Sequence, residues 1–319
     1  MGSSSKKKNL YTIGFYNLEN LFDIKDDPHT LDDDFTPDSD KKWNEKRYNK
    51  KVKKLGRVIS QIGYEHTGYA PAILGIAEVE NNTVIEALLA SKFLKKKGYN
   101  YVHYDSPDER GIDTALLYRK DIFKVDHSEV FGLQLTDEHG APDHTRDVLH
   151  VRGRLEGEAF HILVNHWPSR RSGTEETEHK RIAAAEKNRE IIAQIISEDP
   201  DARIVIMGDF NDNPKCKSIY TLMEQEFYNP MDLLWTRYEG SLNHRGAWNL
   251  FDQIILSNNF LKPYDNPFQF EKARIFNPKD LQEFKGRFKG NPFRTYAGPK
   301  YKGGISDHFP VYTIFSIGK

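Results

Sequence analysis

Short strand-like segments recur along the whole chain, and this pattern constrains the fold more than any other feature. They are rich in β-branched and aromatic residues, are bounded by turn residues, and cover residues 11–17, 72–79, 114–119, 147–155, 159–167, 203–210, 251–257 and 309–315. Residues 72–76 and 204–207 are continuous apolar runs, which indicates strands covered on both faces. Residues 148–155 largely alternate between apolar and polar, as on an antiparallel strand with one solvated face.

Helical patterns lie between the predicted strands, at residues 50–63, 83–97 and 178–198. Two long irregular connections remain: an acidic one at residues 23–40 and one rich in Lys, Gly and Pro at residues 277–304. No repeat and no linker composition divides the 319 residues. We therefore expect one mixed α/β domain over residues 10–319, preceded at residues 1–9 by a disordered tail or a remnant of the expression vector.

Composition excludes several classes of protein. A single cysteine rules out an internal disulfide and a cysteine-based zinc cluster. The formal net charge of -1 argues against a strongly basic nucleic-acid binder. No apolar run approaches the ~20 residues of a membrane span. Monomer is the default expectation.

The first eight residues are polar and then basic, without the apolar stretch of a secretory signal. A cytoplasmic location is therefore the default expectation. An exported form from which a signal has been removed stays open as the alternative.

The strongest chemical motif follows the apolar run at residues 204–207. There the chain continues into Gly208-Asp-Phe-Asn-Asp212, so a buried strand ends in side chains with oxygen atoms. If the strand persists, Asp209 and Asn211 point to the same side, where a carboxylate and a carboxamide can orient and deprotonate a water molecule. The alternative is that the two residues only form an Asx-type turn.

A second motif, Ser306-Asp-His308, precedes the last strand. An imidazole oriented by a carboxylate is a common acid–base unit. Adjacent residues on a strand point apart, so His308 is expected to pair with a carboxylate other than Asp307. Asp252, at the start of a predicted strand, is the candidate, and a simple loop cap at residues 306–308 is the alternative.

Oxygen-bearing side chains also end two other predicted strands. Glu78 closes residues 72–79, and Asn17 and Glu19 lie at the end of the first strand. Together they offer the hard oxygen ligands that Mg²⁺ prefers, although Glu78 could instead pair with a Lys or Arg. The histidines form no helical i, i+4 pairs, which favours Mg²⁺ or Mn²⁺ over zinc.

A fourth motif, Asn165-His-Trp-Pro-Ser-Arg-Arg171, leaves a strand and enters a loop. His166 would lie at the strand end. Ser169, Arg170 and Arg171 supply a hydroxyl and two guanidinium groups suited to phosphate oxygens. The alternative is an ordinary basic surface loop.

These motifs occur in an order that resembles the endonuclease/exonuclease/phosphatase superfamily. The segments that carry the resemblance are residues 16–23, Glu78, residues 110–118, residues 165–169, residues 208–211, Asp252 and residues 306–308. Each segment by itself is weak evidence for the family, but seven segments in the right order are strong evidence. The match spans residues 11–316. The resemblance implies a four-layer α/β sandwich, with two mixed sheets face to face and helices outside.

The resemblance also implies a phosphoester hydrolase dependent on Mg²⁺ or Mn²⁺. Glu78 would be the principal metal ligand, with Asn17, Glu19 and Asp307 near the metal. Asp209 would activate the attacking water and Asn211 would hold the scissile phosphate. His308, oriented by Asp252, would bind a phosphate oxygen or protonate the leaving group. His166 would be a second catalytic histidine, and Arg110 would join Ser169, Arg170 and Arg171 in binding substrate.

The natural phosphoester stays open at this stage. Residues 284–296 interleave aromatic and basic side chains, which favours a nuclease acting on DNA or RNA. The same kind of site serves small-molecule, lipid and inositol phosphates, which is the second hypothesis. A catalytically inactive binding module is the third.

Overall fold

The computed structural model describes residues 9–136, 140–171, 173–224, 227–262 and 267–318. The expected tail lies outside the described residues except for Asn9, which begins the first strand. Two mixed six-stranded sheets form the centre of the molecule. The first contains, in spatial order, β15 (Phe268–Ile275), β18 (Val311–Ile317), β1 (Asn9–Leu21), β2 (Ile73–Val79), β4 (Asp113–Arg119) and β3 (Tyr99–His103). The second contains β11 (Phe227–Tyr228), β14 (Asp252–Ser257), β10 (Ile204–Asp209), β9 (Glu158–His166), β8 (Val148–Leu155) and β5 (Phe123–Phe131).

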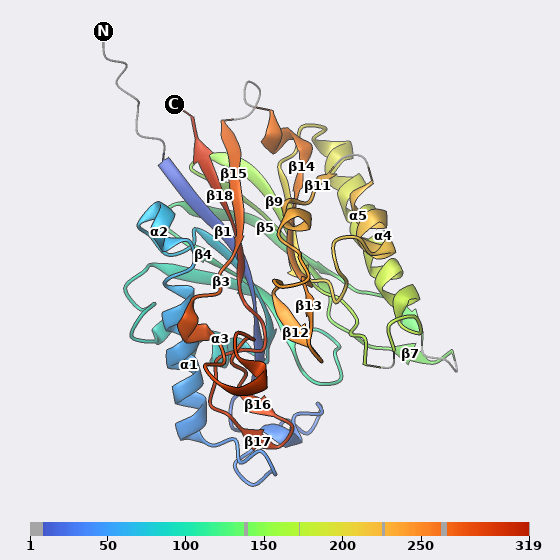
Figure 1. Ribbon diagram of the computed structural model, residues 1–319. Helices are drawn as coiled ribbons and strands as arrows, with labels where there is room; N and C mark the ends of the chain where they lie inside the picture. The colour runs from blue at the N-terminus through green and yellow to red at the C-terminus, as the bar shows by residue number, and fades with distance from the viewer. Residues whose placement is uncertain (1–8, 137–139, 172, 225–226, 263–266, 319) are drawn as a thin grey trace.

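Helices cover the outer face of each sheet, so the fold has four layers (Figure 1). The helices are α1 (Glu45–Ile59), α2 (Tyr64–Thr67), α3 (Asn82–Ala90), α4 (Glu178–Glu198) and α5 (Lys217–Met223). Helices α1 and α3 pack on the first sheet, and α4 and α5 pack on the second. The predicted four-layer α/β sandwich is confirmed.

The main core lies between the two sheets, where side chains of both inner faces interdigitate. Ile13 and Phe15 of β1 meet Val205 and Met207 of β10, and all four are fully buried. Gly75 allows the sheets to approach closely here, because a Cβ atom at this position would lie 2.6 Å from the sulfur of Met207. The apolar runs predicted to be covered on both faces are indeed central strands.

Smaller elements surround the sandwich. Three short strand pairs are β6 (Leu135–Thr136) with β7 (Pro142–Asp143), β12 (Leu242–His244) with β13 (Ala247–Asn249), and β16 (Tyr296–Ala297) with β17 (Lys300–Tyr301). The described residues also contain five 3₁₀ helices, at Asp33–Phe35, Pro230–Leu233, Asn258–Leu261, Lys279–Leu281 and Gly286–Phe288. The acidic connection at residues 23–40 packs against the segment that contains β16, through Phe35 and Tyr296, whose ring centroids lie 6.4 Å apart. The two irregular connections therefore share one end of the molecule (Figure 1).

The predicted elements differ from the observed ones mainly at their ends. α4 has the predicted bounds, whereas α1 begins at Glu45 because Asn44 caps it, accepting a hydrogen bond from the backbone of Arg47. α3 stops at Ala90 instead of continuing to residue 97. The edge strands β3, β5 and β15 were not predicted, since their polar residues weaken the strand pattern. Within the described residues, no helix combines the length and apolar character needed to cross a membrane.

Candidate active site

Strands of both sheets bring the proposed functional residues to one rim of the sandwich. β10 pairs with β9 and β14 so that Asp209 lies beside His166 on one side and Asp252 on the other. In the facing sheet, β1 and β2 run parallel and carry Asn17 and Glu78 near their C-terminal ends. His308 comes from the loop before β18. The topology thus gathers six side chains that are far apart in the sequence.

Asp209 is the centre of this group. It is 2% exposed and accepts a hydrogen bond from the amide nitrogen of Asn17 at 3.0 Å. The Nε2 atoms of His166 and His308 lie 3.8 and 3.9 Å from its Oδ2 atom. Burial raises the pKa of Asp209 to about 6, although the charge of His308 lowers this pKa and offsets part of the rise. A carboxylate poised in this way is suited to accept a proton from water near neutral pH.

The two histidines at Asp209 are in opposite electrostatic environments. His308 Nδ1 lies 2.6 Å from Asp252 Oδ2. Burial by itself would lower the pKa of His308, but Asp252 and Asp209 raise it well above its ordinary value, so the ring is an imidazolium. Burial, together with Arg146 and Arg110, lowers the pKa of His166 well below its ordinary value, so this ring is neutral. Titratable groups whose environments separate their pKa values are typical of acid–base catalysis.

Glu78 and Asn17 form the part of the site that fits a divalent cation. Glu78 Oε1 is 3.3 Å from the amide nitrogen of Asn17 and 3.9 Å from His166 Nε2, and its Oε2 accepts from the backbone of Asn20 at 2.8 Å. The backbone of Glu78 is left-handed, with φ of 61°, which is uncommon for a residue with a side chain. Such strain concentrates at functional sites. A half-buried carboxylate beside an amide supplies the hard ligands that Mg²⁺ or Mn²⁺ prefers.

The carboxylates of Glu19 and Asp307 contact a backbone amide and protein cations. Glu19 accepts from the backbone of Thr295 at 2.6 Å and lies 4.0 Å from the buried ammonium of Lys51. Asp307 pairs with Arg294 at 2.5 Å. Burial and the charge of Asp307 raise the pKa of Glu19 to about 7. These two residues form a separate carboxylate pair beside Glu78 and Asn17.

Asn211 adopts the turn that was the alternative at the sequence level. Strand β10 ends at Asp209, and the backbone nitrogen of Asn211 donates to Asp209 Oδ1 at 3.0 Å, with a left-handed φ of 49°. Strand β10 therefore does not persist to Asn211, and the Asx-type turn replaces the same-side arrangement that depended on its persisting. The side-chain nitrogen of Asn211 donates to the carbonyl of Trp167 at 3.0 Å, which leaves its second N–H for another acceptor.

The predicted substrate-binding arginines are placed differently from one another. Arg170 is bonded to Asp212 and to the carbonyl of Asn211, so its guanidinium braces the Asp209 loop. Arg171 is exposed and Ser169 half-buried in the same loop. Arg110 reaches from the β3–β4 loop to the side chain of Asn20, next to Glu78.

Two buried cations near the site were not predicted. Arg146 is bonded to Asp108 at 2.8 Å and to the carbonyl of Trp167 at 2.7 Å, which fixes the loop after His166. Lys51 on α1 donates to the carbonyl of Glu19 and to the hydroxyl of Thr295. No local sequence pattern distinguishes either residue from a surface cation, because their partners are distant in the chain.

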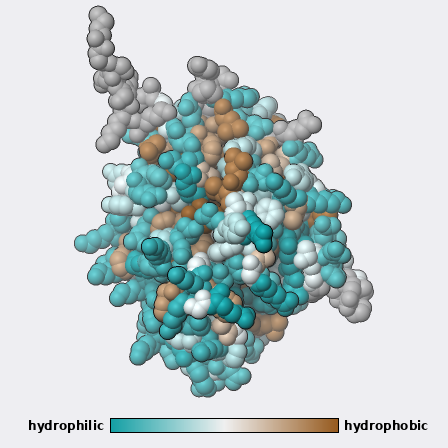
Figure 2. Space-filling model, viewed as in Figure 1, coloured by the Kyte–Doolittle hydropathy of each residue, from teal (hydrophilic) through white to brown (hydrophobic). Residues whose placement is uncertain are grey.

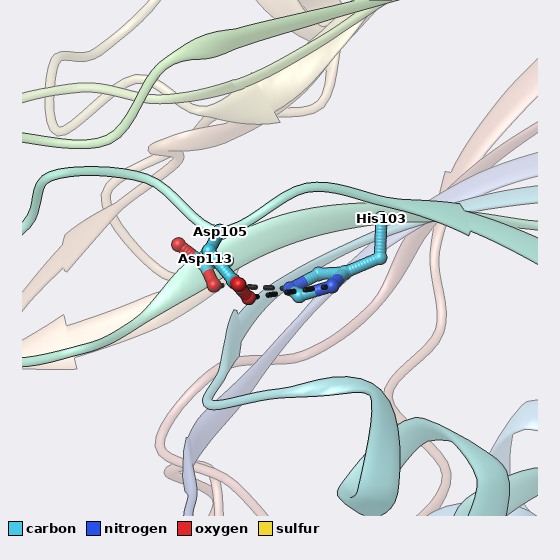
Figure 3. A group of neighbouring side chains, drawn as sticks. All are labelled: His103, Asp105 and Asp113. Atoms are coloured by element: carbon cyan, nitrogen blue, oxygen red, sulfur yellow. Dashed lines mark hydrogen bonds and ion pairs between the residues drawn. The ribbon is translucent and has the colours of Figure 1, made fainter. Parts of the chain in front are cut away.

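A neighbouring group joins the edge strand β3 to β4 at the same rim (Figure 3). His103 contacts Asp113 at 3.0 Å and Asn82 at 3.0 Å, and Asp113 also accepts from the hydroxyl of Ser106 at 2.6 Å. The third acidic residue, Asp105, lies 4.0 Å from the ring and is largely exposed. This network anchors the loop that carries Arg110.

The fold and the site together define a hydrolase of phosphate esters. A family model described as endonuclease/exonuclease/phosphatase family matches residues 12–317. The chain belongs to this family. No curated protein matches the chain.

Solved structures with the same fold cover nearly the whole chain. A Bacteroides thetaiotaomicron endonuclease/exonuclease/phosphatase family protein is 16% identical with a TM-score of 0.61, covering 98% of this chain and 99% of its own. A mannosyl-6-phosphatase of the same organism is 17% identical with a TM-score of 0.58, covering 96% and 99%. A humanised TDP2 of D. rerio is 14% identical with a TM-score of 0.60, also covering 96% and 99%.

Proposed function

We propose that the protein is a Mg²⁺- or Mn²⁺-dependent phosphodiesterase that hydrolyses nucleic-acid strands with an activated water. The observation that carries the proposal is the contact of Asp209 with a cationic His308 on one side and a neutral His166 on the other. A phosphodiester is anionic and resists attack, so a base must be combined with groups that neutralise charge.

Different residues of the site carry out the separate steps of hydrolysis. Asp209 accepts the proton of the attacking water, and His308, held by Asp252, donates to a phosphate oxygen or protonates the leaving group. Asn211 offers its free N–H to the scissile phosphate, and neutral His166 stands beside Glu78 and Asp209 without adding positive charge. A Mg²⁺ or Mn²⁺ ion held by Glu78 and Asn17 would neutralise the non-bridging oxygens of the phosphate. Arg110 and Arg171 remain candidates for contacts with substrate, with Ser169 beside them.

Exposed aromatic and basic side chains next to the site support a nucleic-acid strand as substrate. Phe284 and Phe288 are 66% and 47% exposed, and Arg287 lies 4.6 Å from the centre of the Phe288 ring. Their segment is fixed to the site by the pairing of Arg294 with Asp307. Aromatic rings beside cations are a common surface for stacking single-stranded bases. A TDP2 of D. rerio with this fold was solved with single-strand DNA product, at 15% identity.

A specific observation favours a second candidate, a phosphatase or phosphodiesterase acting on a small-molecule, lipid or inositol phosphate. The acidic connection at residues 23–40 packs on the same basic segment, where the ring centroids of Phe35 and Tyr296 lie 6.4 Å apart. Carboxylates at the rim repel a long polyanion more strongly than a single phosphate group, because the polyanion carries many more negative charges. The similar fold of a mannosyl-6-phosphatase is consistent with this candidate.

A substrate panel separates the two candidates. It contains plasmid DNA, single-stranded RNA, bis-p-nitrophenyl phosphate, sphingomyelin, an inositol polyphosphate and a sugar phosphate, each with Mg²⁺ and with Mn²⁺. Cleavage of DNA or RNA with a steep salt dependence supports the nuclease. Turnover of only the lipid or the small phosphates supports the second candidate, and inertness on the whole panel contradicts both.

A further inference from the structure

A basic cavity lies between the start of α1 and the strand β17, at the end of the molecule where the two irregular connections meet (Figure 1). It has a volume of about 320 Å³, which is within the range of sites for small ligands. Hydrophilic side chains predominate at this end of the molecule (Figure 2). The cavity is lined by three cations, an amide and a phenol ring, namely Lys46, Arg47, Lys50, Asn44 and Tyr301. None of the described residues that line it is acidic, so the lining fits an anion.

The cations of this cavity lack the carboxylate partners that neutralise other cations of the same helix. Arg57, near the end of α1, pairs with Asp280. In the part of the chain that the structure describes, no ion pair involves Lys46, Arg47 or Lys50, and the two lysines are exposed. Like charges around one cavity repel one another, and an anion bound between them relieves this repulsion.

Arg47 is already oriented for a ligand. Its guanidinium carbon lies 4.3 Å from the centre of the Tyr301 ring, which is a cation–π contact. Its Nη1 atom also donates to the carbonyl of Lys41. A guanidinium group has five N–H donors, so other donors remain for the oxygen atoms of a ligand. A planar fork held in this way suits phosphate, which it can bind through two parallel hydrogen bonds.

Cations and aromatic rings continue from this cavity to the stacking surface beside the active site. The ammonium of Lys50 lies 5.9 Å from the centre of the Tyr301 ring, and one turn further along α1 that of Lys54 lies 5.8 Å from the Phe293 ring. The centroid of Phe293 is 6.3 Å from that of Phe284, which is exposed. Proteins that bind single strands combine cations that follow the backbone with rings on which bases stack.

Buried contacts fix the cavity relative to the catalytic residues. Lys51, on the opposite face of α1, donates to the carbonyl of Glu19 and to the hydroxyl of Thr295. The backbone of Thr295 donates to the carboxylate of Glu19 at 2.6 Å. Glu19 follows Asn17 by two residues in β1, so α1 and the β16–β17 pair are both attached to the strand that leads to the proposed metal site.

We propose that this cavity binds a backbone phosphate of the nucleic-acid strand whose scissile phosphate occupies the active site. The proposal rests on the proposed function, since it concerns a second contact of the same substrate. Arg47 binds the phosphate oxygens through its fork, and Lys46 and Lys50 neutralise the charge. A strand long enough to engage both places gains affinity from each of them, whereas a single phosphate group occupies only one.

The test measures binding of fluorescent oligothymidines of increasing length by anisotropy. The protein carries Asp209→Asn and is saturated with Mg²⁺, so the strand is not cut. We expect Lys46→Ala/Lys50→Ala to raise Kd for the longest strand roughly 10-fold and to reduce the slope of log K against log salt by roughly 1.4, twice the ~0.7 per phosphate of a single strand. The shortest strand should show a much smaller change. Tyr301→Leu should also weaken binding, because it removes the ring that orients Arg47, whereas Tyr301→Phe keeps that ring and should not.

Two exposed lysines at the opposite end of the sheets provide the matched control. Lys120 follows β4, and Lys124 lies at the start of β5. Lys120→Ala/Lys124→Ala removes the same charge and should bind every strand as tightly as the parent. Thermal unfolding confirms that each variant is folded. An unchanged Kd and salt slope in Lys46→Ala/Lys50→Ala, or an equal loss in the control, overturns the proposal.

Failure of the proposed function is read separately, because this test measures binding and not hydrolysis. The substrate panel decides whether nucleic acid is cleaved. The cavity proposal stands if Lys46→Ala/Lys50→Ala alone loses affinity for the longer strands, and it falls if that variant binds them as the parent does.

Discussion

His308 Nδ1 and Asp252 Oδ2 are 2.6 Å apart in the buried rim of the sandwich, although 56 residues separate them in the chain. The carboxylate keeps the ring protonated and fixes which nitrogen faces Asp209. The first prediction follows from this contact. Asp252→Asn should lower the pKa of His308, so that the alkaline limb of the pH–rate profile moves to lower pH and the rate falls at least ~10-fold.

The sign of this shift is fixed by the raised pKa of His308. The protonated ring is the active form, and its contribution is lost as pH rises through the pKa in the folded protein. NMR titration of the imidazole in wild type and Asp252→Asn measures the shift directly. An alkaline limb that stays in place in the variant would show that His308 does not act as the acid.

Asp209→Asn should abolish catalysis and stabilise the fold. The loss should be at least ~100-fold in kcat, as for the removal of a positioned base. Burial raises the pKa of Asp209 to about 6 from 3.8, so the folded state favours the protonated form. The stability that this preference contributes is complete below pH 3.8 and is lost as pH rises to about 6.

At neutral pH the buried, ionised carboxylate therefore lowers the stability of the fold, and its replacement by asparagine removes this destabilisation. We expect the free energy of unfolding of metal-free Asp209→Asn to rise by on the order of 1 kcal/mol at pH 7. Urea denaturation at pH 4 and pH 7 measures the effect, which should be smaller at pH 4. A variant that is less stable at pH 7 than wild type would contradict the assignment of a raised pKa to the catalytic carboxylate of Asp209.

Glu78→Gln tests the metal site. The amide keeps the size of the side chain but removes the charge that attracts the cation, so the Mg²⁺ concentration for half-maximal hydrolysis should rise at least ~10-fold. EDTA should abolish activity of the wild type, and added Mg²⁺ or Mn²⁺ should restore it. Glu86→Gln, on the adjacent helix α3, is the control and should leave the metal requirement unchanged. Hydrolysis that persists at an unchanged rate in EDTA would exclude Glu78 as the ligand of a catalytic metal ion.

Lys51→Met tests the buried cation beside Glu19. Lys51 is 2% exposed, and its removal leaves a buried carboxylate without its compensating charge. Loss of one partner of a buried pair typically costs about 3–5 kcal/mol of stability. Chemical denaturation should show a loss of this order, whereas Lys53→Met on the exposed face of the same helix should change stability by less than about 0.5 kcal/mol. Equal stabilities of the two variants would contradict the proposed pairing.

Phe288→Ala tests the stacking surface. Stacking of a base on an aromatic ring contributes about 1–3 kcal/mol, so KM for a single-stranded nucleic acid should rise about 10-fold. Hydrolysis of bis-p-nitrophenyl phosphate should change much less, because that substrate offers no strand of bases to stack on the surface. Tyr220→Phe, on exposed helix α5, is the control for a surface aromatic change. An unchanged KM for nucleic acid would favour the small-molecule candidate.

The positions of Asp209 and Glu78 at strand ends, and of His308 shortly before the last strand, could be predicted because local patterns mark where buried strands stop and start. The pairing of His308 with Asp252 was predictable too, since adjacent residues on a strand cannot face each other. The sequence left Asn211 open between a continued strand and an Asx-type turn, and the structure shows the turn, with a left-handed Asn211 after the strand ends at Asp209.

Residues that depend on distant partners were not predictable. Arg170 carries a phosphate-binding signature in its loop, yet Asp212 occupies its guanidinium. Arg146 and Lys51 resemble surface cations in sequence, and only their contacts with Asp108 and Thr295 bury them. Glu19 was placed beside Glu78 by sequence order, but its carboxylate meets the backbone of Thr295.

The sequence by itself determined the alternation of strands and helices and the identity of the side chains that end each central strand, because local hydrophobic periodicity and turn residues set both. The sandwich class was implied by the resemblance of the ordered motifs to a known superfamily. Only the tertiary structure decided which histidine at Asp209 is charged, since that depends on carboxylates and arginines contributed by strands and loops far apart in the chain. It also placed Glu129 opposite His150 on two strands under α4, because cross-strand register is fixed by the packing of whole sheets rather than by neighbouring residues.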